Sequence, residues 1–218
     1  RTSLLPGLLQ NLMYNLQRQH TNIKLFESAK IFISNNKLNS EKDVISGISY
    51  GSRVNEQWDI KSKSIDFYDV KGDLELLFTS LKINDQISYS NNSHPMLCPG
   101  KSAKINLNDL TIGYLGVLNP ELIMDLDLAQ SPVLFEINKD CLELPSKVNY
   151  QDEPYFPSSR RDISLLMDEK QEISSILKII KQLKIPILKN IIIFDVYKGK
   201  NIESGRKSVA LGLIFQAK

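Results

Sequence analysis

A strict alternation of residue types near the end of the chain constrains the fold more than any other feature. Across residues 207–216, one set of alternate positions is apolar and the other is mostly small or polar. The first set is Val209, Leu211, Leu213 and Phe215, and the second is Ser208, Ala210, Gly212, Ile214 and Gln216. Successive side chains of a β-strand point to opposite faces of a sheet. The pattern therefore predicts a strand with one face against a core and one open face.

Two earlier segments of the same region also read as strands. Residues 163–168 alternate, and in residues 191–197 we expect Ile192, Phe194 and Val196 on one face, with Asp195 and Tyr197 on the other. Between them, residues 172–184 place apolar side chains at helical spacing. The order strand, helix, strand, strand is the first two-thirds of a ferredoxin-like fold. A second helix and a fourth strand are expected to be missing from this chain.

The first two-thirds of the sequence predict a separate, largely antiparallel α+β module. The expected helices span residues 5–18, 67–81 and 119–126, and the expected strands span 25–33, 44–50, 103–107, 110–118 and 132–137. We expect turns at Asn35-Asn36 and Asn108-Asp109, since Asn and Asp tolerate positive φ. Residues 55–64 and 98–103 read as loops. The proposed division is a module at 1–143, an extended linker at 144–156, and the ferredoxin-like domain at 157–218.

Charge is distributed unevenly between these two regions. Residues 1–150 carry 15 Lys and Arg against 17 Asp and Glu, whereas residues 151–218 carry 12 against 8, a net charge of +4. A basic second region suits contact with a polyanion, although chance variation in surface charge gives the same picture. No apolar run reaches the ~18–20 residues of a membrane span, and no secretion signal opens the chain, so we expect a cytoplasmic protein. Arg1 in place of Met suggests a chain cut from a longer protein.

The open face of the second region carries the candidate binding residues. Tyr197 offers a ring on which a nucleobase can stack, Asp195 can accept hydrogen bonds from guanine N–H groups, and small residues let a flat ligand approach. Nearby basic residues are candidate phosphate contacts: Arg160, Arg161, Lys198, Arg206 and Lys207. A solvated sheet face with ordinary soluble loops is the alternative interpretation.

Several short stretches, in the same order along the chain, resemble one known family. Residues 155–163 (Tyr-Phe-Pro-Ser-Ser-Arg-Arg-Asp-Ile), 194–199 (Phe-Asp-Val-Tyr-Lys-Gly) and 204–208 (Ser-Gly-Arg-Lys-Ser) resemble the ferredoxin-fold anticodon-binding domain of bacterial phenylalanyl-tRNA synthetase β-subunits. Four upstream stretches resemble the class II synthetase-like module of those subunits. They are 1–9 (Arg-Thr-Ser-Leu-Leu-Pro-Gly-Leu-Leu), 25–27 (Leu-Phe-Glu), 71–75 (Lys-Gly-Asp-Leu-Glu) and 113–122 (Gly-Tyr-Leu-Gly-Val-Leu-Asn-Pro-Glu-Leu).

The resemblance implies a role in attaching phenylalanine to its tRNA. The family forms an (αβ)₂ ligase in which the α-subunit holds the active site and uses ATP and Mg²⁺. The β-subunit's synthetase-like module supports assembly without catalysing, so no cofactor or metal is expected in this chain. The resemblance also implies that Asp195, Tyr197 and Ser208 engage the first anticodon base, a guanine. Those residues lie in the region that alternation marks as open.

The residues themselves argue against catalysis by this chain. A class II active site needs an arginine two positions before the glutamate of Phe-Arg-x-Glu, and here Leu25 stands two positions before Glu27. No Gly-x-Gly-x-Gly-x-Arg run occurs. The stretch 98–103 reads Cys-Pro-Gly-Lys-Ser-Ala where the family often has His-Pro-Gly-Arg-Ser-Ala, so any specific role of that loop is in doubt.

Two other function classes are alternatives for this sequence. A hydrolase would use Cys98 with His94 or His20, but nothing in the sequence fixes either imidazole as a base. Two cysteines and two histidines without ligand spacing argue against a zinc site. A regulatory ferredoxin-like module would bind a small metabolite in a niche at the sheet edge rather than RNA on an open face.

Overall fold

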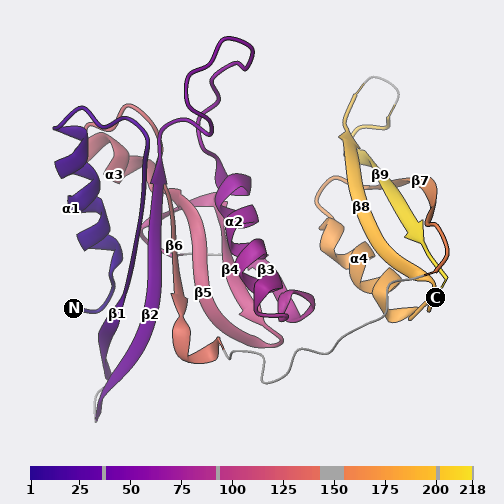
Figure 1. The fold of residues 1–218 in the computed structure, drawn as a ribbon, viewed down its shortest axis with the longest axis horizontal. Helices are drawn as coiled ribbons and strands as arrows, with labels where there is room; N and C mark the ends of the chain where they lie inside the picture. The colour runs from indigo at the N-terminus through magenta and orange to yellow at the C-terminus, as the bar shows by residue number, and fades with distance from the viewer. Residues whose placement is uncertain (36–37, 92–93, 143–154, 200–201, 218) are drawn as a thin grey trace. The chain divides into compact units, whose positions relative to one another are not determined.

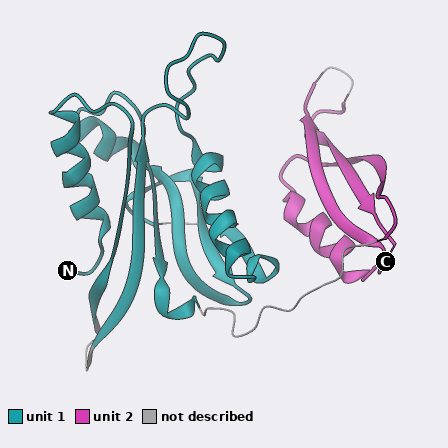
Figure 2. Cartoon of the chain, in the orientation of Figure 1, with its two compact units in different colours: residues 1–147 teal, residues 148–218 magenta. Residues whose placement is uncertain are grey.

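A computed structural model describes the chain except for residues 36–37, 92–93, 143–154, 200–201 and 218. The chain divides into two compact units, Arg1–Lys147 and Val148–Lys218 (Figure 2). Most of the expected linker at 144–156 lies outside the described residues, as does Asn36 of the expected turn. None of the helices in the described ranges is long and apolar enough to cross a membrane.

Unit 1 is built on one six-stranded sheet in the order β1-β2-β6-β5-β4-β3, and all of its neighbouring strands are antiparallel (Figure 1). The strands are β1 (Ile23–Asn35), β2 (Leu38–Tyr50), β3 (Ile87–Asn91), β4 (Leu97–Leu107), β5 (Leu110–Leu118) and β6 (Val133–Asn138). The β4–β5 turn forms as expected, with Asn108 at a φ of +53°. Two short 3₁₀ turns, η1 (Asn84–Gln86) and η2 (Lys139–Cys141), complete the unit.

Helices cover both faces of this sheet. The helices are α1 (Leu5–Leu16), α2 (Phe67–Ser80) and α3 (Pro120–Asp125). Leu134 packs in the core that contains the buried face of α1, whereas its neighbour Val133 packs in the core that contains α2. Because adjacent strand residues face opposite ways, α1 and α2 lie on opposite sides of the sheet.

Unit 2 is a three-stranded antiparallel sheet with one helix. Its elements are β7 (Ser159–Asp168), α4 (Ile173–Gln182), β8 (Leu188–Tyr197) and β9 (Arg206–Phe215). The sheet order is β7-β9-β8, so the strand with the strict alternation lies in the centre. Val209 and Leu211 of β9 are fully buried and pack against Ile173, Ile176 and Ile180 of α4. The predicted α+β class and the antiparallel sheets are confirmed.

The structure corrects several details of the expected elements. β7 begins at Ser159, so Arg160 and Arg161 lie within the strand rather than before it. Residues 98–103, expected to form a loop, belong to β4, where a register shift interrupts the pairing with β5. Strand β3 was not expected from the sequence.

A larger correction concerns β8. The register against β9 shifts between Ile193 and Asp195, which leaves Phe194 as an extra residue. Such a bulge interrupts the two-residue period, because two residues on one strand oppose one on its partner. The expectation that Ile192, Phe194 and Val196 share a face is therefore wrong. Ile192 pairs with Gly212 and Val196 with the buried Val209, and those two partners lie on opposite faces of β9.

Candidate nucleic-acid interface

The sheet face of unit 2 opposite α4 brings the three predicted recognition residues together. Tyr197 of β8 is paired with Ser208 of β9, and Asp195 is paired with Ala210. Ser208 and Ala210 alternate with the buried Val209 and Leu211, so both lie on the face away from α4. An acceptor, a ring and a hydroxyl therefore share one open surface.

The ring of Tyr197 rests over the backbone of Gly199. The Tyr197 side chain is 48% exposed, so one side of it is available to a ligand. A Cβ atom placed on Gly199 would overlap the hydroxyl end of the ring and lie 2.9 Å from its Cε1 atom. Glycine at position 199 thus makes room for the ring in this orientation.

The hydroxyl of Ser208 is paired across the sheet. Its Oγ lies 2.8 Å from the Oγ of Ser164 on β7, close enough for a hydrogen bond in which either can donate. Ser208 is half-buried, so its hydroxyl sits at the floor of the face. The pairing with Ser164 was not expected from the sequence, where the two residues are 44 positions apart.

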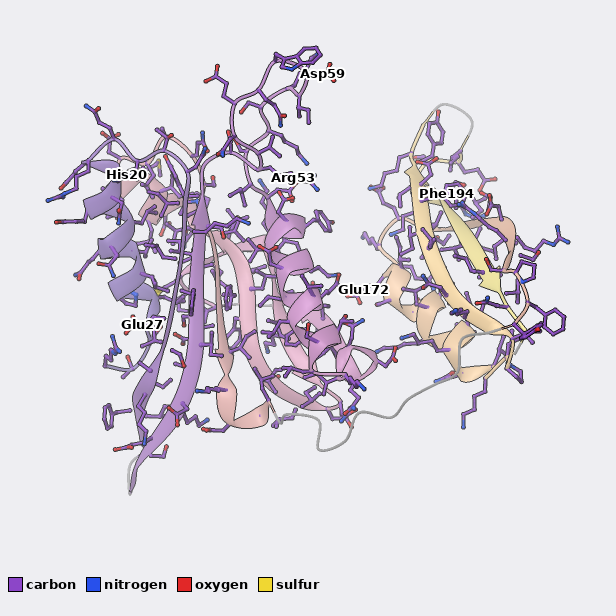
Figure 3. All side chains as sticks on the ribbon, in the orientation of Figure 1. His20, Glu27, Arg53, Asp59, Glu172 and Phe194 are labelled. Atoms are coloured by element: carbon purple, nitrogen blue, oxygen red, sulfur yellow. The ribbon has the colours of Figure 1, made fainter. Side chains whose placement is uncertain are left out.

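A second group of side chains lies further along the same face. Arg160 of β7 donates from Nε to Oδ1 of Asp162 at 2.7 Å, and its Cζ atom lies 4.9 Å from the centre of the Phe194 ring. The same guanidinium crosses Gly212 of β9, where an added Cβ would be 2.9 Å from Nε. Figure 3 labels Phe194 on the sheet of unit 2. Four successive apolar residues, 191–194, carry no two-residue period, so alternation could not have placed Phe194 here.

The other predicted phosphate contacts have different surroundings. Arg161 alternates with Arg160 and pairs with Leu213, which places it on the α4 side of the sheet. Lys207 is only 9% exposed, and its ammonium donates to the carbonyls of Glu169 and Gln171 at 2.9 and 2.6 Å. Its charge is already engaged within unit 2.

Lys198 and Arg206 form ion pairs beside the open face. Lys198 lies 2.6 Å from Glu169, and Arg206 lies 3.5 Å from Glu203. The hydrogen bond from Lys198 holds the pKa of the Glu169 carboxyl below its usual value. Both cations are exposed, so an approaching phosphate can compete with their carboxylate partners in high-dielectric surroundings.

In unit 1, the position that would bear a catalytic arginine faces a core. Leu25 of β1 packs against the apolar cluster that contains α1. Glu27, two residues further on, forms an ion pair with Arg1 at 2.6 Å. This strand therefore presents no cation at the position where a class II active site would hold a phosphate.

Cys98 and His94 of unit 1 make local contacts. Sγ of Cys98 donates to the carbonyl of Pro99 at 3.5 Å, and Nδ1 of His94 accepts from the N–H of Met96 at 3.3 Å. Neither contact pairs the thiol with a base. In the described ranges, no group of three or more His, Cys, Asp or Glu side chains is placed to hold a metal ion.

Comparison with known proteins identifies the family. The family model described as the phenylalanyl tRNA synthetase beta chain CLM domain matches residues 1–139, and the ferredoxin-fold anticodon binding domain matches residues 154–218. The chain belongs to the phenylalanyl-tRNA synthetase beta chain family. This confirms the resemblance inferred from the sequence motifs.

Curated members of the phenylalanyl-tRNA synthetase beta chain family match along the whole chain. The chain is 41% identical to the phenylalanine–tRNA ligase beta subunit of Coxiella burnetii over 99% of its length, and 40% identical to that of Carboxydothermus hydrogenoformans over 100%. It spans about 27% of the length of each. Among solved structures, a pyrrolysyl-tRNA synthetase from Desulfitobacterium hafniense aligns with a TM-score of 0.48 at 14% identity, over 65% of this chain and 47% of that one.

Proposed function

We propose that this chain is a non-catalytic part of a phenylalanine–tRNA ligase, and that unit 2 recognises the anticodon of phenylalanine tRNA. The observation that carries the proposal is the convergence of Asp195, Tyr197 and Ser208 on one open sheet face within a region that matches an anticodon-binding domain. On this proposal unit 1 supports assembly with the α-subunit in an (αβ)₂ enzyme in the cytoplasm. Residues 144–156 are the proposed linker between the two modules.

The three side chains supply complementary recognition of a guanine. The Tyr197 ring is a stacking surface for the base, and such contacts tolerate any base because every base has a π-face. The Asp195 carboxylate accepts hydrogen bonds from guanine N–H groups, which adenine, cytosine and uracil do not present in the same arrangement. The Ser208 hydroxyl can donate to or accept from the base edge. Stacking thus provides affinity and the two polar groups provide specificity.

Exposed cations at the edge of this face are proposed to contact the RNA backbone. Lys198 and Arg206 are the candidates, because both are exposed. Lys207 is not a candidate because two carbonyls hold its buried ammonium, and Arg161 is not a candidate because it lies on the α4 side. Such contacts make affinity fall as salt concentration rises.

The chemical steps are proposed to take place elsewhere in the enzyme. ATP and Mg²⁺ would act in the α-subunit, where phenylalanine is activated and transferred. The apolar Leu25 at the position of a phosphate-binding arginine supports this division of labour.

The test is to compare tRNA-dependent and tRNA-independent reactions of the intact synthetase. Tyr197→Ala should weaken tRNA binding by roughly 1–3 kcal/mol, about five- to more than a hundredfold. Tyr197→Phe should keep most of the wild-type tRNA affinity, since the π-face of the ring remains. Asp195→Asn should weaken discrimination for guanine, because the NH₂ group of the amide is a hydrogen-bond donor and would face the N–H donors of the base.

ATP–pyrophosphate exchange with phenylalanine is the matched control, since it requires no tRNA. It should be unchanged in all three variants. An unaltered tRNA Michaelis constant and turnover in Tyr197→Ala would defeat the assignment of this face to the anticodon.

A further inference from the structure

The guanidinium of Arg160 is held flat on the open face of unit 2. An added Cβ on Gly212 would lie 2.9 Å from its Nε, 3.1 Å from its Cζ and 3.1 Å from its Nη2. Three nearly equal distances mean that the group lies across the glycine rather than pointing away from the sheet. Any larger residue at 212 would displace it. Because Gly212 of the central strand has no side chain, its backbone forms the surface on which the guanidinium lies.

Two neighbours hold the guanidinium in this position. Asp162, two residues further along β7, accepts from Nε at 2.7 Å. Phe194, which the bulge in β8 brings to this side, has its ring centre 4.9 Å from Cζ. The Arg160 side chain remains 48% exposed and Phe194 remains 49% exposed, so both present surface to solvent.

We propose that Arg160 and Phe194 form a second base-stacking position, which takes the nucleotide next to the one held at Tyr197. The inference rests on the proposed RNA-binding function and extends it by one nucleotide. An arginine plane is weakly hydrated and stacks on flat π-systems, and single-stranded RNA bases stack on both aromatic rings and guanidinium planes.

Stacking is favoured over a phosphate contact by the carboxylate beside Arg160. A phosphate binds a guanidinium along its N–H edges, and here Nε–H already donates to Asp162 while the group lies flat across Gly212. The flat face of the guanidinium is unaffected by this pairing. A neutral base can stack on this face without electrostatic repulsion from the Asp162 carboxylate.

The spacing of the two positions suits nucleotides whose bases are unstacked from each other. Tyr197 is paired with Ser208, and Gly212 follows four residues later on the same strand. Four residues along a strand advance roughly 14 Å. Bases splayed out from a single strand can span two positions this far apart without the RNA having to leave the sheet.

The substitution Arg160→Lys keeps the positive charge but removes the planar guanidinium, so it distinguishes stacking from charge attraction. We would measure the affinity of the intact (αβ)₂ synthetase for a phenylalanine tRNA transcript with wild type, Arg160→Lys, Arg160→Ala and Phe194→Leu. Each variant should lose about fivefold or more, because stacking on a base is worth roughly that much. Arg161→Lys, on the opposite face of the same strand, is the matched control and should leave affinity unchanged.

Transcripts that lack one base identify the contact. With the nucleotide before or after the first anticodon position made abasic, one of the two transcripts should bind wild type and Arg160→Lys equally. Retained affinity in Arg160→Lys with a loss in Arg160→Ala would show a phosphate contact and overturn the proposal. Equal losses with every transcript, or no loss in any variant, would overturn it too. Melting temperatures report whether each variant folds, and the conservative Arg160→Lys remains informative if Arg160→Ala does not.

The outcome separates this inference from the function on which it rests. If Tyr197→Ala weakens tRNA binding while Arg160→Lys and Phe194→Leu do not, only the second position fails. If Tyr197→Ala has no effect either, the assignment of the whole face to RNA fails with it.

Discussion

The hydroxyl oxygens of Ser164 and Ser208 lie 2.8 Å apart on the neighbouring strands β7 and β9. Ser208 is one of the three proposed contacts to the first anticodon base, whereas Ser164 was not singled out by the sequence. A hydroxyl can rotate, so the direction of its proton depends on its partner. On the proposed function, the pair would couple a residue of β7 to recognition on β9.

Ser164→Ala is expected to weaken tRNA binding indirectly, through Ser208. One neutral hydrogen bond is worth about 1 kcal/mol, so losing the orientation it gives Ser208 is expected to cost two- to fivefold in affinity. Because the pair is exposed, water can replace the lost partner and the melting temperature should change little. Ser208→Ala should lose at least as much. Binding assays on the two single variants and the double variant would check this. If the two losses simply add, the hydroxyls act independently and the coupling is disproved.

Gly199→Ala should disturb the ring of Tyr197 more than it disturbs the fold. The new methyl group would overlap the end of the ring, and that end belongs to a side chain that can rotate away. We expect tRNA affinity to fall roughly two- to tenfold, since the stacking surface is displaced, with little change in melting temperature. In a Tyr197→Ala background the same substitution should have no further effect. A further loss there would show that Gly199 acts through something other than the ring.

The arrangement of β9 was predictable from sequence because burial of one face imposes a two-residue period. Val209 and Leu211 are fully buried, as that period requires. The same reasoning failed in β8, where four consecutive apolar residues hide the period and a bulge at Phe194 breaks it. No propensity of the local sequence marks this bulge, which depends on pairing with a strand further along the chain.

Lys207 shows a second limit of sequence reasoning. A lysine beside a turn reads as exposed, yet this one is buried because carbonyls of Glu169 and Gln171 receive its ammonium. Those acceptors lie 38 and 36 residues away in sequence. The net positive charge of this region can be read from its composition, but the groups that the Lys207 ammonium contacts depend on the tertiary fold.

Glu136 provides a test of what secures α1 to the sheet. Its Oε2 accepts from the hydroxyls of Ser3 and Ser46 at 3.0 and 2.7 Å, and from the N–H of Leu4 at 2.8 Å, just before α1. A carboxylate near a helix N-terminus is also favoured by the helix dipole. Ser46 is fully buried, so its hydroxyl depends on this acceptor.

Glu136→Ala should lower the free energy of unfolding by roughly 2–4 kcal/mol, because it leaves buried donors without an acceptor. Glu136→Gln should cost less, since the amide oxygen can still accept. Urea denaturation of the chain measures both, and Glu56→Ala, at an exposed position, is the control. A loss in Glu136→Ala no larger than in Glu56→Ala would show that the three contacts do not stabilise unit 1.

Asp66 caps α2 and predicts a pH-dependent stability. Its Oδ1 accepts from the N–H groups of Tyr68 and Asp69 at 2.9 and 3.2 Å, and Lys63 donates to its Oδ2 at 2.8 Å. The Lys63 hydrogen bond, together with the two backbone donors, holds the pKa of the Asp66 carboxyl below its usual value of 3.8. The ionised form is therefore favoured in the folded state.

The sign of the pH effect follows from this lowered pKa. Near and below pH 3.8 the unfolded chain binds more protons at Asp66 than the folded chain does, so stability from this residue rises with pH. Asp66→Ala should cost roughly 0.5–2 kcal/mol at neutral pH, the usual range for an N-cap. The difference from wild type should persist down to about pH 5 and shrink as the pH falls through the folded pKa of Asp66.

Asp66→Asn keeps a capping oxygen without the charge, so it should lose less than Asp66→Ala and differ from it by an amount independent of pH. Denaturant unfolding of the three proteins from pH 7 to pH 3 measures these differences. A gap between wild type and Asp66→Ala that stays constant over that range would show that the charge of Asp66 does not contribute to the cap.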